Sequence, residues 1–282
     1  MSHSAHGYTY AKCCICYRTF YVLRFMKTNP VIECLLDHRS IRKFTEQEPT
    51  DEVLETIVRA GQQAPFASQT YSVLLSRKRE RNPFKAPLSF TVCVDSHKFE
   101  RIMEERGWEF YMNDLSFLFL SIQDASLMAE NMIIAGRSLG LGSCLLGAAM
   151  GRAVKIAEDF NLPPRVFPLV GLVMGYPDED PPPRPRYPLE YTLFEDEYPR
   201  CAGKTVREAM KVMDEGYLAQ DYYSSRNAKI PLTGGREETY THENYSWTEH
   251  ICRKLGQWSP DPKGLLEQLE KRGFHITKSR EE

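Results

Sequence analysis

Hydrophobic residues recur at helical spacing in two stretches of the first hundred residues. The first pattern predicts a helix over residues 29–38, because an asparagine and a proline at its start supply an N-cap and a first-turn proline. The second predicts a helix over residues 50–64, with acidic residues in its first turn and a proline directly after it. Runs rich in Val, Leu and Phe at residues 71–76 and 89–95 predict two strands.

The longest helical pattern covers residues 115–139 and is apolar on most sides. A helix of this kind is expected to be buried, here in an interface shared with another subunit. It breaks at residues 140–142, whose two glycines suit a C-terminal cap. An amphipathic helix over 152–160 and a buried strand over 167–174 are predicted next.

The last hundred residues begin with a proline-dense, extended segment at 176–188 and contain a polar loop around 233–244. Helical stretches lie on both sides of this loop, with large apolar residues that need a surface to pack on, either the core or a partner subunit. These residues are Tyr222, Tyr223, Trp247, Leu265, Leu266, Leu269 and Phe274.

Composition and charge describe a globular chain of ordinary type. The 282 residues carry 36 Lys and Arg against 38 Asp and Glu, a net charge of −2, and 42% are hydrophobic. A chain of this length buries enough surface to be stable without disulfides or metals. The near-neutral balance argues against nucleic-acid binding, which normally leaves a basic excess.

The N-terminal region shows no regular pattern before Met26, so residues 1–25 are predicted to be an extension outside the folded protein. Its uncharged runs of five residues are too short for a signal peptide or a membrane span, and a cytoplasmic protein is expected. Cys13 and Cys16 have zinc-ligand spacing, but no second pair follows, so no metal site is predicted. The eight cysteines do not form a disulfide framework.

Two arginine-containing clusters could carry chemistry. The first is the run His38, Arg39, Ser40, Ile41 and Arg42, a compact donor array suited to a phosphate. Its alternative interpretation is a solvated helix end with cations that complement the helix dipole.

The second cluster is Arg184-Pro185-Arg186, which follows three prolines. In an extended chain residues i and i+2 point the same way, so both guanidiniums could converge on one dianion. The alternative is a surface arginine pair in a proline loop.

The loop of Ala64, Pro65, Phe66 and Gln69 offers small residues, an aromatic ring and an amide to a planar heterocycle. No general base, nucleophile, phosphate-binding loop or zinc-protease motif is recognisable, so no catalytic residue is assigned. The glycines at 140–142 follow a helix, which is the wrong context for a dinucleotide-binding fingerprint.

Taken in order, these clusters resemble the FMN-dependent nitroreductase family over about residues 30–195. The resemblance implies that residues 38–42 and 184–186 clamp the FMN phosphate and that Gln69 lies near the isoalloxazine ring. It also implies that the loop at 64–66 lies along the flavin, and that Leu146 and Gly147 approach the ring from the other side.

The tail is similar to the flavin-reductase and oxygen-insensitive nitroreductase branch, in which an arginine matching Arg226 is associated with the extra phosphate of NADPH. The chain departs from the family in a short stretch before residue 89 and in Pro65-Phe66. Both departures bear on the shape of the substrate pocket.

The resemblance implies an α+β fold with a central sheet flanked by helices, built as an intertwined homodimer with FMN sites at the interface. Residues 26–199 would form the FMN-binding domain and residues 200–282 a C-terminal extension. The implied activity is transfer of two electrons from NAD(P)H to nitroaromatics, quinones or flavins. The alternatives are another flavin reaction on the same scaffold, such as reductive dehalogenation or flavin fragmentation, and a non-catalytic FMN-binding protein.

Overall fold

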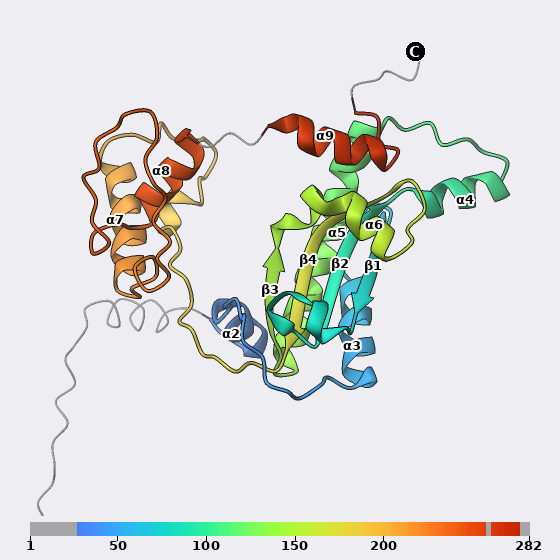
Figure 1. Cartoon of the computed structure of the whole chain (residues 1–282), viewed down its shortest axis with the longest axis horizontal. Helices are drawn as coiled ribbons and strands as arrows, with labels where there is room; N and C mark the ends of the chain where they lie inside the picture. The colour runs from blue at the N-terminus through green and yellow to red at the C-terminus, as the bar shows by residue number, and fades with distance from the viewer. Residues whose placement is uncertain (1–26, 258–260, 277–282) are drawn as a thin grey trace, which may run out of the picture. The chain divides into compact units, whose positions relative to one another are not determined.

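The computed structural model describes residues 27–257 and 261–276. The predicted extension at residues 1–25, with Cys13 and Cys16, lies outside the described residues, as does Met26. The chain divides into two compact units (Figure 1). The sheet unit contains residues 37–183 and 261–276, and the helical unit contains residues 27–36 and 184–257. The predicted domain boundary at residue 200 stays a prediction.

The sheet unit contains both helices and strands, and the regular elements described in the other unit are all helical. In chain order they are α2 (Pro30–Leu36), α3 (Asp51–Gln62), β1 (Tyr71–Ser76), η1 (Arg79–Arg81), η2 (Pro83–Lys85), β2 (Leu88–Asp95), α4 (His97–Glu105), α5 (Asp114–Ser138), β3 (Gly142–Leu146), η3 (Gly147–Arg152), α6 (Ala153–Asp159), β4 (Val166–Gly175), η4 (Leu189–Tyr191), α7 (Lys204–Leu218), α8 (Trp247–Gln257) and α9 (Pro262–Lys271).

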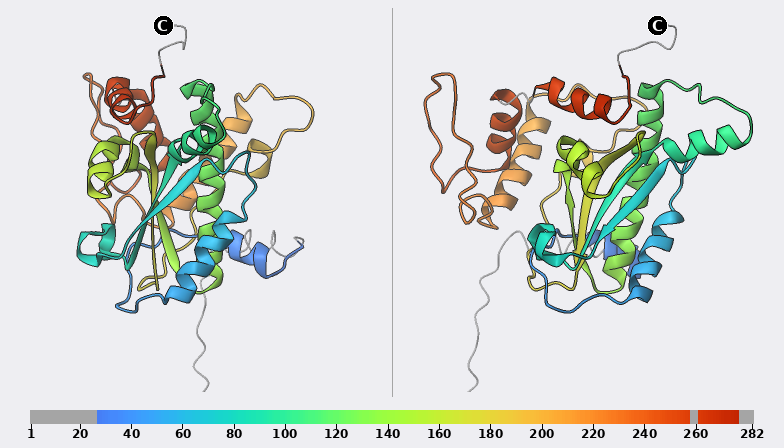
Figure 2. Two further views of the ribbon diagram at one scale, coloured as in Figure 1. Left: turned by 90° about the vertical axis from the view of Figure 1, so that its right-hand side faces the viewer. Right: turned by 45° about the vertical axis from the view of Figure 1, so that its right-hand side comes forward.

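The sheet has four strands in the order β1-β2-β4-β3, and every neighbouring pair is antiparallel. An antiparallel sheet combined with helices confirms the predicted α+β class. Figure 2 shows α3 and α5 along one face of the sheet and α6 near the other. The main core lies between the sheet and α5 and includes Phe90, Leu172, Met128 and Met132. A smaller cluster around Ile41 contains residues of β3 and β4 on the opposite face.

The two helices that support the loop before β1 are capped by side chains that favour N-caps. Thr50 accepts a hydrogen bond from the N–H of Val53 at the start of α3, and Asn113 accepts one from Ser116 at the start of α5. At the other end of α5, Gly140 has a φ of +83°, which a glycine adopts without steric cost.

Helix α5 is long and apolar enough to cross a membrane by length and composition, but half of its most apolar window is buried inside the protein. It is therefore the core helix of the sheet unit. The same helix also carries a stripe of exposed apolar side chains, spaced by four and three residues. Leu115 is 46% exposed, Phe119 64% and Ile122 40%. Large apolar side chains at such positions are typical of a surface that another protein chain covers.

The end of the described chain returns to the sheet unit. Leu269 of α9 and Phe274 belong to the main core, as expected for apolar residues of the tail. Arg165, Asp114 and the carbonyl of Gly273 form a hydrogen-bonded group that joins this segment to the start of α5. The last helix thus helps to complete the sheet unit.

The helical unit is built on an aromatic cluster. Tyr223 is buried and stacks on His250, and Tyr217 stacks on Tyr223 and on Trp247. Helix α2 has the predicted apolar stripe, but none of its residues is buried.

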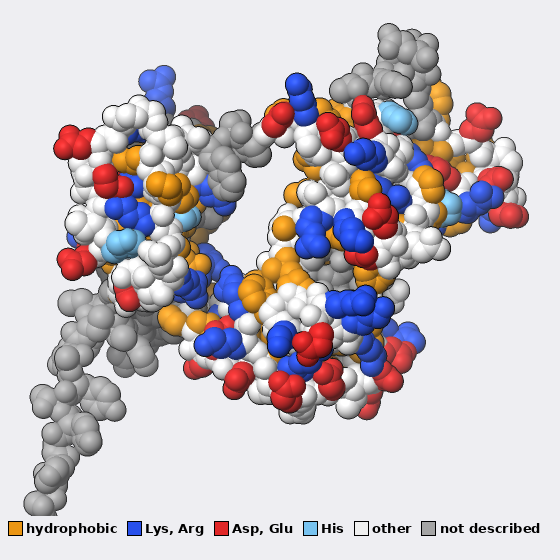
Figure 3. All heavy atoms as spheres, in the orientation of Figure 1, with side chains coloured by type: hydrophobic (Ala, Val, Ile, Leu, Met, Phe, Trp, Pro, Cys, Tyr) orange, Lys and Arg blue, Asp and Glu red, His pale blue; other side chains and the backbone are white. Residues whose placement is uncertain are grey.

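Charged side chains of both signs are interspersed over the face of the sheet unit seen in Figure 3. Exposed ion pairs of the sheet unit include that of Arg59 with Glu55 at 2.6 Å. Such pairs in water contribute little to stability.

One strand and one α-helix of the sheet unit were not predicted. Strand β3 was missed because Gly142, interpreted as part of a helix cap, is instead its first residue, paired with Gly175. Helix α4 was missed because its first turn and its exposed face are highly charged, and none of its residues is buried. The strands and helices that were predicted with residue ranges are confirmed to within two residues at each end.

Candidate functional site

The segment that carries the first predicted cluster lies against the edge strand β3. The N–H of Ile41 donates to the carbonyl of Ser143 at 2.8 Å, and Ser40 forms a parallel bridge with the same residue. Ile41 is buried, and a Cβ on Gly142 would lie 2.5 Å from its Cγ1. The absence of a side chain at Gly142 therefore lets Ile41 fix this backbone, on which the half-buried His38 and the two arginines are carried.

The two arginines of this segment have different surroundings. Arg39 forms ion pairs with Asp37 and Asp180, so carboxylates already compensate its charge. Arg42 is half-buried, and its backbone N–H donates to Glu179 at 2.5 Å. Within residues 27–257 and 261–276 its guanidinium makes no ion pair. Arg42 is therefore the arginine of this cluster whose charge is available to an anion.

The loop between α3 and β1 places the third predicted group. Ala64 is buried and anchors the loop, while Pro65, Phe66 and Gln69 are exposed, Phe66 by 52%. Gln69 has a φ of +56°, a left-handed conformation that is uncommon for a residue other than glycine. The loop therefore holds one amide in a defined, unusual backbone position.

Asp124 of α5 holds this loop, and the sequence analysis missed its role. Its carboxylate accepts the N–H groups of Ala67 at 2.7 Å, Ser68 at 3.1 Å and Thr70 at 3.1 Å, and also the Thr70 hydroxyl at 3.1 Å. Gln69 is the residue of this run whose N–H does not bind Asp124. The signal in the sequence that could have revealed this role is an isolated carboxylate on the buried face of an apolar helix. A charge in such a place needs hydrogen-bonding partners to be stable.

Leu146 and Gly147 lie where β3 passes into η3. Leu146 packs against the smaller cluster around Ile41. A Cβ on Gly147 would meet no atom of the described chain within 4 Å, so the backbone at this glycine is open to approach.

The register of the sheet separates Arg42 from Gln69. The loop of Gln69 lies at the end of the sheet where Asp95 pairs with Val166, the first residue of β4. The N–H of Arg42 binds a carboxylate four residues beyond Gly175, which ends β4. A ten-residue strand spans about 30 Å, so the two predicted parts of the site lie at opposite ends of one chain's sheet.

The second arginine cluster lies in the helical unit, against α7. A Cβ on Gly216 would lie 2.5 Å from the Pro185 ring, so the glycine lets this proline seat on the helix. Arg186 is exposed, and its guanidinium donates to the carbonyls of Arg184 and Pro185 at 3.0 and 3.1 Å. These acceptors are neutral, so the charge of Arg186 is not compensated by them.

Arg184 instead contacts the chain after α7, at Gln220 and Tyr222. Its guanidinium hydrogen-bonds the Gln220 side chain, and its central carbon lies 4.1 Å from the centre of the Tyr222 ring. The guanidinium carbon of Arg226 lies 4.1 Å from the centre of the same ring. The expectation that Arg184 and Arg186 point the same way is not what these contacts show, whereas Arg184 and Arg226 share one aromatic neighbour.

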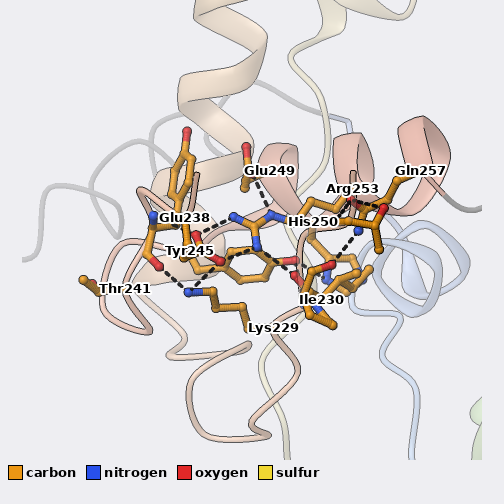
Figure 4. Close-up of polar contacts among 12 residues, drawn as sticks. Lys229, Ile230, Glu238, Thr241, Tyr245, Glu249, His250, Arg253 and Gln257 are labelled. Atoms are coloured by element: carbon orange, nitrogen blue, oxygen red, sulfur yellow. Dashed lines mark hydrogen bonds and ion pairs between the residues drawn. The ribbon is translucent and has the colours of Figure 1, made fainter. Parts of the chain in front are cut away.

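A buried ion-pair group fixes the chain that follows Arg226 (Figure 4). The Arg253 side chain is 2% exposed and binds both carboxylate oxygens of Glu238 at 2.8 Å, Glu249 at 2.7 Å and the carbonyl of Ile230 at 2.7 Å. Hydrogen bonds from Arg253 lower the pKa of Glu238, which keeps the pair charged. Arg253 thus ties the segment that begins four residues after Arg226 to α8.

His250 supports the same segment in its neutral form. The Ile230 N–H donates to the Tyr245 oxygen at 3.1 Å, and the Tyr245 oxygen lies 3.1 Å from His250 Nδ1. Burial and the charge of Lys254 lower the pKa of His250, although a hydrogen bond with the backbone of Ala228 opposes this. A neutral imidazole can accept a hydrogen bond from the Tyr245 hydroxyl, whose oxygen in turn accepts from the Ile230 N–H. Both donors therefore have an acceptor.

A separate cavity of about 820 Å³ lies elsewhere in the sheet unit and contains none of the predicted site residues. Its lining includes Glu100, Trp108, Phe110, Arg165 and His275. Over the residues that the structure describes, no group of three or more His, Cys, Asp and Glu side chains could hold a metal ion.

Comparisons with known proteins match almost the whole chain. The sequence model of the nitroreductase family matches residues 35–81 and 74–176, and that of the nitroreductase family C-terminal domain matches residues 184–277. The chain is 32% identical over 264 residues to an FMN reductase (NADPH) of Bacillus subtilis, covering 88% of this chain and 99% of the relative. It is 28% identical to an oxygen-insensitive NADPH nitroreductase of Salmonella typhimurium, covering 87% and 98%.

Solved structures agree with these matches. The NfrA1 nitroreductase from Bacillus subtilis superposes with a TM-score of 0.71 at 29% identity, covering 86% of this chain and 98% of that one. The structure of YcnD from the same organism gives a TM-score of 0.74 at 26% identity, covering 89% and 100%.

Proposed function

Because this chain belongs to the nitroreductase family, we propose that it binds FMN and passes two electrons from NAD(P)H to a nitroaromatic, a quinone or a flavin. It is an FMN-dependent NAD(P)H oxidoreductase, like the relatives that it matches along their full length. The observation that carries the residue assignment is that, among the described residues, the guanidinium groups of Arg42 and Arg186 form no ion pair with a carboxylate.

The donor set fits the phosphate of FMN. Guanidinium groups bind phosphate oxygens in a planar, bidentate geometry and stay charged at any working pH. Arg42 and Arg186 would form the two main contacts, with Ser40 and His38 beside the first and Arg184 beside the second. Arg39 would contribute less, because Asp37 and Asp180 already take its charge.

The ring end of the cofactor would meet the loop of Pro65, Phe66 and Gln69, and the open backbone at Leu146 and Gly147. Gln69 offers an amide that can donate to or accept from the ring edge, and Phe66 offers an exposed apolar surface. Bound FMN supplies the electron-transfer chemistry, accepting a hydride and passing on two electrons. The side chains hold the cofactor, orient its ring and exclude water, which agrees with the absence of a recognisable general base.

Two copies of the chain are needed to assemble such a site. Arg42 and Gln69 lie at opposite ends of a strand about 30 Å long, which an FMN molecule with its five-carbon ribityl chain does not span. In an intertwined homodimer, Arg42 of one chain and Gln69 of a second copy would meet the same cofactor. The exposed stripe of Leu115, Phe119 and Ile122 on α5 supports such a dimer, since association would remove it from water.

Arg226 would read the 2′-phosphate of NADPH. It is exposed, and its guanidinium rests on Tyr222 rather than on a carboxylate, so its charge is available to an anionic ligand. A cytoplasmic location, where reduced nucleotides are the electron donors, completes the proposal.

The test is the absorption spectrum of the purified protein, followed by anaerobic addition of NADH and of NADPH. We expect flavin absorbance that is bleached by a reduced nucleotide and restored by a quinone. A colourless protein that gains no flavin absorbance with excess FMN would contradict the proposal. Flavin that is reduced by light but by neither nucleotide would favour a non-catalytic FMN-binding protein, and nucleotide oxidation that quinones do not stimulate would favour another flavin reaction.

A further inference from the structure

The carboxylate of Asp124 is built into the loop that presents Gln69. Three backbone N–H groups, from residues 67, 68 and 70, and one hydroxyl converge on its two oxygens at 2.7–3.1 Å. Backbone N–H groups of one short run can converge on an anion where a residue within the run is left-handed. Here that residue is Gln69, with a φ of +56°.

Asp124 is charged although it is 2% exposed. Burial by itself would raise its pKa, but the hydrogen bonds from Ala67, Thr70 and Ser68 outweigh burial and lower it. Asp124 forms no ion pair with a cation of the described chain, so these loop donors are what stabilise its charge. The carboxylate and the loop conformation thus depend on each other.

We propose that Asp124 is the positioning residue for the flavin ring: its carboxylate holds Gln69 in the left-handed conformation from which the amide reaches the cofactor. The proposal rests on the proposed function, because the role of Gln69 belongs to it. It adds a residue of α5, outside every predicted cluster, to the machinery that orients the ring.

An asparagine at position 124 would not replace the carboxylate. Its single oxygen can accept from two of the donors, but its NH₂ group would then face N–H groups instead of an acceptor. Buried donors that lose their acceptor are costly, so the loop would leave this conformation. Glu130, an exposed carboxylate on the same helix, provides a matched control.

The first measurement needs no cofactor. Hydrogen exchange of the flavin-free protein, followed over peptides that cover residues 63–72, should show at least tenfold faster exchange in Asp124→Asn than in the unaltered chain. Glu130→Gln should leave these peptides unchanged. Unchanged exchange in Asp124→Asn would overturn the anchoring step, whether or not the protein binds FMN.

The second measurement is FMN affinity, from quenching of FMN fluorescence by the full-length protein. Asp124→Asn should raise the Kd by about tenfold to a hundredfold, as expected when charge-assisted hydrogen bonds are lost. In a Gln69→Ala background, Asp124→Asn should raise the Kd less than about threefold, because the contact between Gln69 and FMN is already lost. An equal effect in both backgrounds would show that Asp124 does not act through Gln69 and would overturn the proposal.

Thr70→Val provides a milder variant in case Asp124→Asn does not fold. It removes one of the four donors, keeps the shape of the side chain and should raise the Kd for FMN by about twofold to tenfold. The proposal would be contradicted if Thr70→Val left both the Kd and the exchange over residues 63–72 unchanged. If the unaltered protein bound no FMN at all, the proposed function would fail, while the exchange measurement would still decide whether Asp124 anchors the loop.

Discussion

The guanidinium carbon of Arg226 lies 4.1 Å from the centre of the Tyr222 ring, which also contacts Arg184 at 4.1 Å. Cations are attracted to the face of an aromatic ring, so one tyrosine orients two arginines that come from distant parts of the sequence. In the proposed function one of these arginines belongs to the cofactor clamp and the other to the nucleotide site.

Loss of Arg226 should therefore change nucleotide preference. Arg226→Ala should raise the KM for NADPH about tenfold and leave that for NADH nearly unchanged, because NADH lacks the 2′-phosphate. Tyr222→Ala should reproduce much of this effect, and Tyr222→Phe, which keeps the ring, should not. Steady-state kinetics with both nucleotides check this, and equal effects on NADH and NADPH would refute the assignment of Arg226.

Arg42 and Arg186 should each contribute to FMN binding. Replacement of either by Ala should weaken the affinity by about 1.5–3 kcal/mol, the usual scale of a charge-assisted hydrogen bond. Arg81→Ala, which removes an exposed arginine of η1, should leave affinity unchanged. Equilibrium titration with FMN measures all three. A variant that keeps full affinity but loses turnover would remove that arginine from the clamp.

The exposed stripe on α5 should be required for the dimer and, through it, for the cofactor. Leu115→Glu combined with Phe119→Glu should yield monomers that do not retain FMN, because each site would need both chains. Leu255→Glu, at an exposed apolar position of α8, is the control. Sedimentation and flavin absorbance report the two properties. A monomer that binds FMN with full affinity would contradict the two-chain site.

Protonation of His250 should destabilise the protein in mildly acidic solution. Its pKa in the folded chain is lowered, chiefly by burial, so the unfolded chain binds more protons between that value and the ordinary one of about 6.5. The contribution of neutral His250 to the free energy of unfolding is therefore complete above about pH 6.5. It is lost as the pH falls toward the lowered pKa.

Thermal melts between pH 7.5 and 5 test this. The melting temperature of His250→Phe, which keeps an aromatic ring on Tyr223, should depend less steeply on pH than that of the unaltered chain. His242→Gln, at an exposed histidine, should follow the unaltered chain. Identical slopes for all three proteins would show that His250 does not titrate in this range.

Local sequence patterns determined most of the secondary structure and the chemical type of the site. The Thr50 cap and the apolar spacing after it are enough to predict α3, since a helix start depends on contacts within a few residues. The clusters at residues 38–42 and 184–186 likewise indicated phosphate chemistry, because guanidinium groups favour phosphate wherever the chain places them.

Tertiary structure decided how those residues are used. Arg39 and Arg42 look alike in sequence, but the fold brings Asp180 to Arg39, which also pairs with its neighbour Asp37. Among the described residues the Arg42 guanidinium forms no ion pair. Asp124 looked like a polar interruption in an apolar helix until the chain placed residues 67–70 around it. The separation of Arg42 from Gln69 follows from strand order and register. Arg39 and Asp180 are 141 positions apart, and Asp124 is 54 to 57 positions from the loop residues that it binds. Pairings at that range depend on how the whole chain packs rather than on any local pattern.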